Sequence, residues 1–172
     1  AYLGDIFLTL QKLDPAEDYI KKAINLKPEN PAYHYILGFI YSNKQQWDKS
    51  IAEFETAVAK EPNNGEYLRG LAWTVYSSGD VAKGLASLEK ASRLAPANAN
   101  ILIDLAVAYL SSVNINKARE YAERAVQLDP INTVAQDVLK EVLSFSKGFR
   151  QRGERADKAV TRPSAYSDTH FI

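Results

Sequence analysis

The side chains that most often do chemistry in proteins are scarce in this sequence. It has no Cys and only 2 His in 172 residues, which removes thiolate nucleophiles, disulfides and cysteine-ligated metals. His34 stands alone on a predicted helix, so we interpret it as a packed or half-exposed structural residue. His170 follows Asp168 by two positions without a further ligand nearby. We therefore expect no catalytic residue, no metal and no cofactor.

The charges of the chain are balanced. Lys plus Arg and Asp plus Glu both number 21, and the 8 Gly are dispersed without a phosphate-binding loop. A neutral protein has no net field to draw it to nucleic acid or to a membrane surface. No apolar run approaches the roughly 18 residues that a membrane span needs. We expect no nucleic-acid partner and no membrane insertion, and the start at Ala1 leads us to expect a fragment or a processed chain.

A period of 34 residues runs through the sequence, and such a period indicates a repeat architecture. Pro recurs at this spacing, Asn follows each Pro by two positions, and Ala precedes each Pro by five. A column of Leu is followed by small residues and, four positions after the Leu, by an aromatic residue in most units. The columns are Pro28, Pro62, Pro96 and Pro130; Asn30, Asn64, Asn98 and Asn132; Ala23, Ala57, Ala91 and Ala125; and Leu3, Leu37, Leu71, Leu105 and Leu139.

Each unit carries the signals of two helices. Pro cannot continue a helix, and the Asn that follows is a good N-cap for the next one. Apolar residues keep helical spacing within each half, and Gly79-Asp80 divides one unit by ending one helix and capping the next. The small residues let two helices approach closely, while the Leu and aromatic columns fill the space between them. Each unit is therefore predicted to be helix–turn–helix.

The sequence resembles a tetratricopeptide repeat (TPR) protein over roughly residues 1–147. The resemblance implies an all-α solenoid of stacked antiparallel helix pairs, wound as a right-handed superhelix with a C-terminal capping helix. The best matches to the 34-residue signature are Leu37-Gly38, Tyr41, Phe54, Ala57 and Pro62. The sequence departs from the signature at two positions. His34, Leu68 and Leu102 stand where Trp is expected. Gln11, Gln45 and Val113 stand where the turn glycine is expected, and Gly79 alone retains that glycine.

The register of the repeats divides the chain into units. We expect a truncated unit at 1–30, full units at 31–64, 65–98 and 99–132, a capping helix at 133–147 and a basic extended tail at 148–172. Lys140 stands in the column of small residues. We therefore expect no further helix to pack against the capping helix, which is what the end of a repeat array requires.

The resemblance also implies which columns line a concave groove. Aromatic residues gather in these columns in the second and third units, and aliphatic residues in the fourth. Exposed apolar patches of this kind mark binding surfaces, and Trp and Tyr dominate binding hot spots. The predicted peptide-binding residues are Tyr35, Phe39, Arg69, Trp73, Tyr76, Ile103, Val107 and Leu110. The alternative interpretation is that the aromatic residues merely extend the core.

One class of TPR ligand can be tested on the sequence. TPR co-chaperones that bind the acidic C-termini of Hsp70 and Hsp90 clamp a carboxylate with Lys, Asn and Arg in the groove columns. In this chain only Arg69 has a suitable charge there, and Glu66, one turn away, is its expected partner. The clamp is therefore absent from these repeats.

The segment from Lys147 to Ile172 is basic. It carries six basic and three acidic residues, so the tail has a net charge of +3 and the repeats have −3. An extended, aromatic segment of opposite charge suits the predicted groove. We hypothesise that the tail binds in the groove of its own chain or of a neighbour, with Tyr166, Phe171 and Ile172 as anchors. A path over another surface is the alternative.

These observations predict a non-catalytic scaffold that binds a protein or peptide segment. A second possibility is a structural module that self-associates into dimers or filaments, through the tail or through the open N-terminal end at Leu3 and Phe7. A third is the docking or regulatory part of a larger enzyme.

Overall fold

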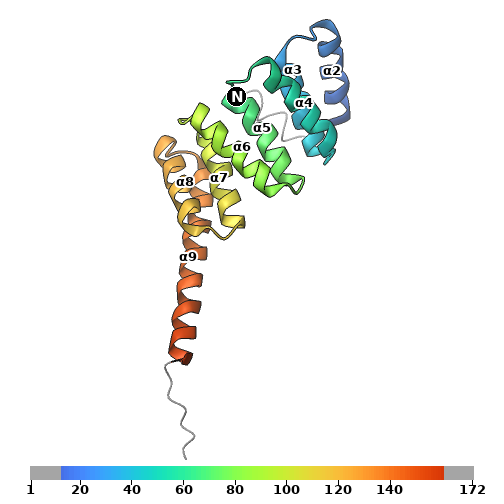
Figure 1. Cartoon of the computed structure of the whole chain (residues 1–172). Coiled ribbons are helices and arrows are strands. Elements are labelled where there is room, and N and C mark those ends of the chain that lie inside the picture. Colours follow the sequence, from blue (N-terminus) through green and yellow to red (C-terminus); the bar gives the residue numbers. More distant parts are fainter. Residues whose placement is uncertain (1–12, 161–172) are drawn as a thin grey trace, which may run out of the picture.

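The computed structural model describes residues 13–160, with side chains up to residue 148, and every regular element in that range is an α-helix (Figure 1). The predicted all-α stack of helix pairs is confirmed. The helices are α2 (Leu13–Leu26), α3 (Pro31–Asn43), α4 (Trp47–Lys60), α5 (Gly65–Ser77), α6 (Val81–Leu94), α7 (Ala99–Ser111), α8 (Ile115–Leu128) and α9 (Thr133–Val160). The expected first helix of the truncated unit, with Leu3 and Phe7, lies outside the described residues.

The helix boundaries follow the Pro and Asn columns. The side chain of Asn64 accepts hydrogen bonds from the backbone N–H groups of Glu66 and Tyr67 at the start of α5. Asn30, Asn98 and Asn132 accept equivalent bonds at the starts of α3, α7 and α9. Asp80 caps α6 through the backbone N–H of Lys83. The N-cap prediction is therefore confirmed, and each cap satisfies donors that a helix start leaves unpaired.

The helices pack as consecutive pairs. α3 packs on α4, α5 on α6 and α7 on α8, with the connections at residues 44–46, 78–80 and 112–114. The pairs stack through contacts of α4 with α5, α6 with α7 and α8 with α9. The first helices α3, α5 and α7 also contact one another in sequence order, and we call this layer the inner layer. It brings one column of residues from each repeat onto a common surface.

One buried aromatic ring fills the space between α3, α4 and α5. Phe54 of α4 is fully buried, and its ring lies against Gly38 of α3 and Gly70 of α5. A Cβ atom built on Gly70 would lie 2.6 Å from Cε1 of Phe54, and one on Gly38 would lie 2.9 Å from Cδ1. These distances are shorter than carbon atoms tolerate. Glycine at positions 38 and 70 therefore makes room for this ring.

The three connections within pairs use a left-handed residue. Gly79 has φ 110°, whereas the equivalent Gln45 and Val113 have φ 56° and 58°. Glycine adopts this region without penalty, but a β-branched residue such as Val does so at a cost. The turn at Val113 is therefore strained.

The last helix is longer than the sequence suggested. α9 continues through Gly148 to Val160, so the extended tail expected from residue 148 is corrected to helix over 148–160. The helix extends beyond the stacked pairs (Figure 1). Residues 161–172, including the proposed anchors Tyr166, Phe171 and Ile172, lie outside the described residues.

The repeat register explains why α9 does not turn back at Gly148. Arg152 stands 34 and 68 residues after Ala118 and Gly84, at the position where the second helix approaches the first most closely. A Cβ atom on Gly84 would already lie 2.5 Å from the backbone N of Tyr76. Arg is much larger than the Gly and Ala of this column, so the register disfavours the second helix of a fifth pair. The chain instead continues α9 to Val160.

No helix in the described part of the chain is both long enough and apolar enough to cross a membrane.

Candidate interaction site

The predicted groove residues lie on the inner layer. Phe39, Trp73 and Val107 occupy the same repeat position on α3, α5 and α7, and all three are half-buried. Tyr76 and Leu110 stand three residues further along their helices and are also half-buried. Because residues three apart share a helix face, these five side chains lie on one surface. We call them the inner-layer apolar set.

The aromatic members of this set have defined partners. The rings of Trp73 and Tyr76 are stacked, with centroids 5.4 Å apart and planes at 15°. Phe39 meets Phe54 edge-on at 5.4 Å, and the guanidinium of Arg69 lies 6.0 Å from the Phe39 ring centroid. Such contacts fix the rings in place, so a ligand would meet preorganised aromatic surfaces and lose less conformational entropy.

Two predicted groove residues belong to the core instead. Tyr35 and Ile103 are each only 7% exposed. Tyr35 packs on Phe39, Phe54 and Tyr67, and Ile103 belongs to the cluster at the α7–α9 end. The alternative interpretation in the sequence, that aromatic residues of these columns extend the core, therefore holds for Tyr35. The sequence pattern did not show that Tyr35 would be buried while Phe39, one turn away, would stay half-buried.

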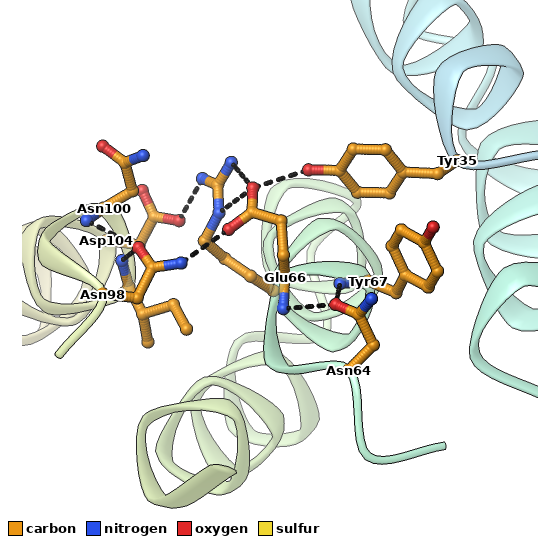
Figure 2. A network of polar contacts seen from close by, with 9 residues as sticks. Tyr35, Asn64, Glu66, Tyr67, Asn98, Asn100 and Asp104 are labelled. Carbon is orange, nitrogen blue, oxygen red and sulfur yellow. Dashed lines mark hydrogen bonds and ion pairs between the residues drawn. The ribbon is translucent and has the colours of Figure 1, made fainter. Parts of the chain in front are cut away.

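Arg69 is held by two carboxylates (Figure 2). Its Nε and Nη2 donate hydrogen bonds of 3.0 and 2.7 Å to Oε1 of Glu66, and its Nη1 donates one of 2.8 Å to Oδ2 of Asp104 in α7. The expected pairing of Arg69 with Glu66 is confirmed. Only 16% of the Arg69 side chain is exposed. Its charge is therefore committed within the protein and is not free for a ligand carboxylate.

Glu66 joins three helices. Its Oε1 also accepts a 2.6 Å hydrogen bond from the Tyr35 hydroxyl of α3, and its Oε2 accepts one of 2.8 Å from Nδ2 of Asn98, the N-cap of α7 (Figure 2). Asn98 thus caps α7 with its side-chain oxygen and reaches α5 with its nitrogen. The network links the first helices of three consecutive repeats.

The pKa values follow the number of hydrogen bonds each carboxylate accepts. Burial acts to raise the pKa of Glu66, but the Arg69 guanidinium and the Tyr35 and Asn98 donors outweigh it, so this pKa is lowered. For Asp104, burial outweighs the single bond from Arg69, and nearby Glu66 adds to the effect, so its pKa is raised. Burial and the bond to Glu66 raise the pKa of the Tyr35 hydroxyl well above its usual range.

Sequence reasoning missed Asp104 and the second role of Asn98. Asp104 lies 35 residues after Arg69, one repeat plus one position, so it is the residue next to the Arg69 column in the following unit. An acidic residue at that offset is a signal that the repeat register makes available. The signal was overlooked because pairing with Glu66 within one helix already accounted for the charge of Arg69.

His34 has a structural environment. Its Nδ1 lies 2.7 Å from Oε2 of Glu53 in α4, and its Nε2 lies 3.1 Å from the carbonyl oxygen of Pro28. Both ring nitrogens therefore have partners, which agrees with the interpretation of a packed residue. In the part of the chain that the structure describes, no three or more His, Asp or Glu side chains are grouped in a way that could hold a metal ion.

Family comparison matches the chain in three stretches. Tetratricopeptide repeat models match residues 3–30, 31–64 and 75–143. No curated protein gives a significant match.

Three solved structures are similar in fold. The Cut9–Hcn1 hetero-tetramer of the APC/C has a TM-score of 0.69 at 20% identity over 83% of this chain, which spans only 29% of that chain. The TPR domain of Arabidopsis OM64 has a TM-score of 0.62 at 18% identity, covering 67% of this chain and 95% of the other. The first TPR domain of Spaghetti (RPAP3), bound to the HSP90 peptide SRMEEVD, has a TM-score of 0.62 at 16% identity, covering 68% and 93%.

The 34-residue columns, the stacked helix pairs and these matches agree over nearly the whole described structure, and the chain belongs to the tetratricopeptide repeat family.

Proposed function

We propose that this chain is a non-catalytic scaffold that binds an extended or helical peptide on its inner layer, through apolar contacts. The observation that carries the proposal is the inner-layer apolar set: Phe39, Trp73 and Val107 in one column of three consecutive repeats, with Tyr76 and Leu110 beside them. Rigid, half-exposed aromatic residues are the side chains that contribute most to peptide binding per contact.

The charges on this surface set the class of ligand. Arg69 is paired with Glu66 and Asp104, so the cluster offers a ligand no unpaired positive charge. A ligand carboxylate placed there would meet repulsion and no free donor from Arg69. A peptide that presents apolar side chains together with a Lys or Arg is therefore favoured over one that ends in an acidic motif. In this respect the chain differs from a TPR domain that clamps a C-terminal carboxylate.

The C-terminal segment of the chain has that chemistry, with Arg162, Tyr166 and Phe171 within a few residues of one another. The direction of α9 bears on how it would reach the inner layer. From residue 148 to residue 160 the helix rises about 18 Å, away from the stacked pairs. The twelve residues that follow span about 40 Å when extended, so the inner layer of the same chain and that of a neighbouring chain are both within reach.

Peptide selection on the full chain tests the proposal. Peptides of about 12 residues would be selected for binding, and their affinities measured with the emission of Trp73 in a Trp47→Phe background. Substituting Phe39→Ala and Trp73→Ala should each weaken binding at least tenfold, the second being followed by calorimetry. Trp47→Ala, a half-exposed aromatic change on α4, is the matched control and should alter affinity less than twofold.

Selected peptides should be enriched in Lys or Arg beside apolar residues. The proposal would be contradicted if neither Phe39→Ala nor Trp73→Ala weakened any selected peptide, or if the peptides that they do weaken were rich in Asp and Glu. Thermal unfolding of each variant separates a lost contact from a lost fold.

A further inference from the structure

The face of α9 that lies away from the inner layer has no covering helix in the described structure. In α7, the equivalent positions Leu105 and Ala106 are fully buried beneath α8, and Tyr109 is 4% exposed. One repeat later, Leu139 and Leu143 are only half-buried and Lys140 is exposed. The same repeat positions are therefore covered on α7 and left uncovered on α9.

An open cavity lies over this face. It has a volume of about 430 Å³ and is lined by Val126 of α8 and by Gln136, Leu139, Lys140, Leu143, Ser144 and Lys147 of α9. Its apolar floor is formed by Val126, Leu139 and Leu143. The volume falls within the range of pockets that hold ligands or the anchoring side chains of a partner. The cavity occupies the place that α8 takes on α7.

The rim of this cavity is positively charged. Lys140 and Lys147 stand seven residues apart on α9, which places them on one face about 10 Å apart along the axis. Neither forms an ion pair with a carboxylate among the described residues, and the lining contains no acidic side chain. The sequence then continues with Arg150, Arg152, Arg155 and Lys158 against Glu154 and Asp157.

Residues 148–172 do not supply a matching cover. Residues 148–160 continue α9 and do not turn back over this face. Residues 161–172 carry one basic residue, Arg162, and one acidic residue, Asp168, so they have no net negative charge to match the rim. Two copies meeting through this same face would bring four lysines together.

We propose that the α8–α9 cavity, with Lys140 and Lys147 at its rim, is a docking site for an acidic amphipathic helix of a partner protein. Its apolar residues insert between Leu139 and Leu143, and its carboxylates, two turns apart, pair with the two lysines. The docked helix takes the place of the missing second helix of a fifth pair. This site is separate from the inner layer and does not depend on the function proposed for it.

A charge exchange tests the proposal on the full chain. The probe is a synthetic helical peptide of about 18 residues with Leu at helical spacing and Glu flanking each Leu. A second peptide has Lys in place of every Glu. Binding of both is measured by calorimetry to the wild type, to Lys140→Glu/Lys147→Glu and to Lys83→Glu/Lys90→Glu. The last variant is the matched control, because Lys83 and Lys90 are also exposed and seven residues apart, on α6.

The wild type and the control should bind the Glu peptide with affinities within twofold of each other. Lys140→Glu/Lys147→Glu should bind it about tenfold more weakly at low salt and should prefer the Lys peptide, because two attractions become two repulsions. Raising the ionic strength should shrink the difference. Leu143→Ala should weaken binding of the Glu peptide to the wild type and of the Lys peptide to Lys140→Glu/Lys147→Glu, because it removes part of the apolar floor.

Three results would overturn the proposal. The first is the absence of binding of the Glu peptide at about 1 mM, or binding that Lys140→Glu/Lys147→Glu leaves unchanged. The second is a tenfold gain in affinity for the Glu peptide when Tyr166→Ala and Phe171→Ala are combined, which would place the chain's own C-terminal segment in the cavity. The third is a wild-type dimer in sedimentation that Lys140→Glu/Lys147→Glu dissociates, which would assign the face to a second copy.

Discussion

Arg69 of α5 and Asp104 of α7 form an ion pair between adjacent repeats, with Nη1 donating to Oδ2 over 2.8 Å and about one sixth of each side chain exposed. Repeat arrays are stabilised by contacts between neighbours, because each unit touches only the units beside it. In this chain, part of that coupling is electrostatic and lies on the surface that we assign to ligand binding. The same network therefore joins the repeats and sets the charge that a ligand meets.

Removing the Arg69 side chain should destabilise the array strongly. Arg69→Met leaves Glu66 and Asp104 close together without their shared cation, and breaking a largely buried pair costs about 3 kcal/mol. Urea unfolding at pH 7 measures this loss. Arg119→Met removes an Arg from the pair with Glu123, where the side chains are 49% and 43% exposed, and should cost less than about 1 kcal/mol. Equal losses for the two variants would mean that the Arg69 network contributes no more than a surface pair.

The charge of the Glu17 carboxylate should make stability depend on acid pH. Hydrogen bonds from Lys21 and then Lys44 lower the pKa of Glu17 from 4.5 to about 2. A carboxylate whose pKa is lower in the folded state stabilises the fold above pH 4.5, and this contribution is lost as the pH falls towards 2. Glu17→Gln should therefore flatten the decline of unfolding free energy between pH 4.5 and 2.

Its control is Glu55→Gln, an exposed residue of α4, which should leave the decline as in the wild type. At pH 7, Glu17→Gln should cost about 1 to 2 kcal/mol, because the Glu17 and Lys44 side chains are only 17% and 16% exposed. If the unfolding free energy of Glu17→Gln declines between pH 4.5 and 2 as steeply as that of the wild type, the lowered pKa of Glu17 does not contribute to stability.

Relieving the strained turn between α7 and α8 should stabilise the protein. Val113 has φ 58° and is 55% exposed, so Val113→Gly removes a backbone strain and loses little packing. The expected gain is about 0.5 to 1 kcal/mol, measured by thermal or urea unfolding. Val81→Gly is the matched control, because Val81 is 43% exposed at the first position of α6. Glycine in this helix should lower the unfolding free energy by about as much as Val113→Gly raises it. Destabilisation by Val113→Gly would indicate that the turn is not strained.

The sequence was most informative where a residue's role is local or repeated. The Asn caps and the pairing of Arg69 with Glu66 need only neighbours within one turn of helix, and the 34-residue columns predicted the helix pairs. The columns also gave the right layer for Phe39 and Trp73. Each of these predictions depends on spacing along the chain, which the sequence states directly.

The sequence was least informative where the answer depends on how helices are rotated against each other. Tyr35 and Phe39 differ by one turn, yet packing buries the first and leaves the second half-exposed. Asp104 meets Arg69 only because α5 and α7 are adjacent in the inner layer. The helical course of residues 148–160 was missed because glycine at position 148 suggests a stop, whereas α9 continues through it to Val160.

The contact between Gly70 and Phe54 gives the sharpest test of the packing that underlies the repeat. A Cβ atom on Gly70 would lie 2.6 Å from the Phe54 ring, so Gly70→Ala must displace a fully buried side chain. We expect a loss of about 2 kcal/mol in unfolding free energy, although alanine is otherwise the better helix former. Gly148→Ala is the matched control, because a Cβ atom there meets nothing within 4 Å; it should gain about 0.5 kcal/mol.

A double-mutant cycle identifies the cause of that loss. Phe54→Leu alone should destabilise by leaving space beside Gly38 and Gly70, by about 1 to 2 kcal/mol. If the ring is what Gly70→Ala displaces, adding Phe54→Leu should recover part of the loss, and the two changes should cost less together than their sum. Strict additivity would mean that the methyl group added by Gly70→Ala is accommodated by backbone movement rather than by the ring. Gly70 would then have a role other than making room for Phe54.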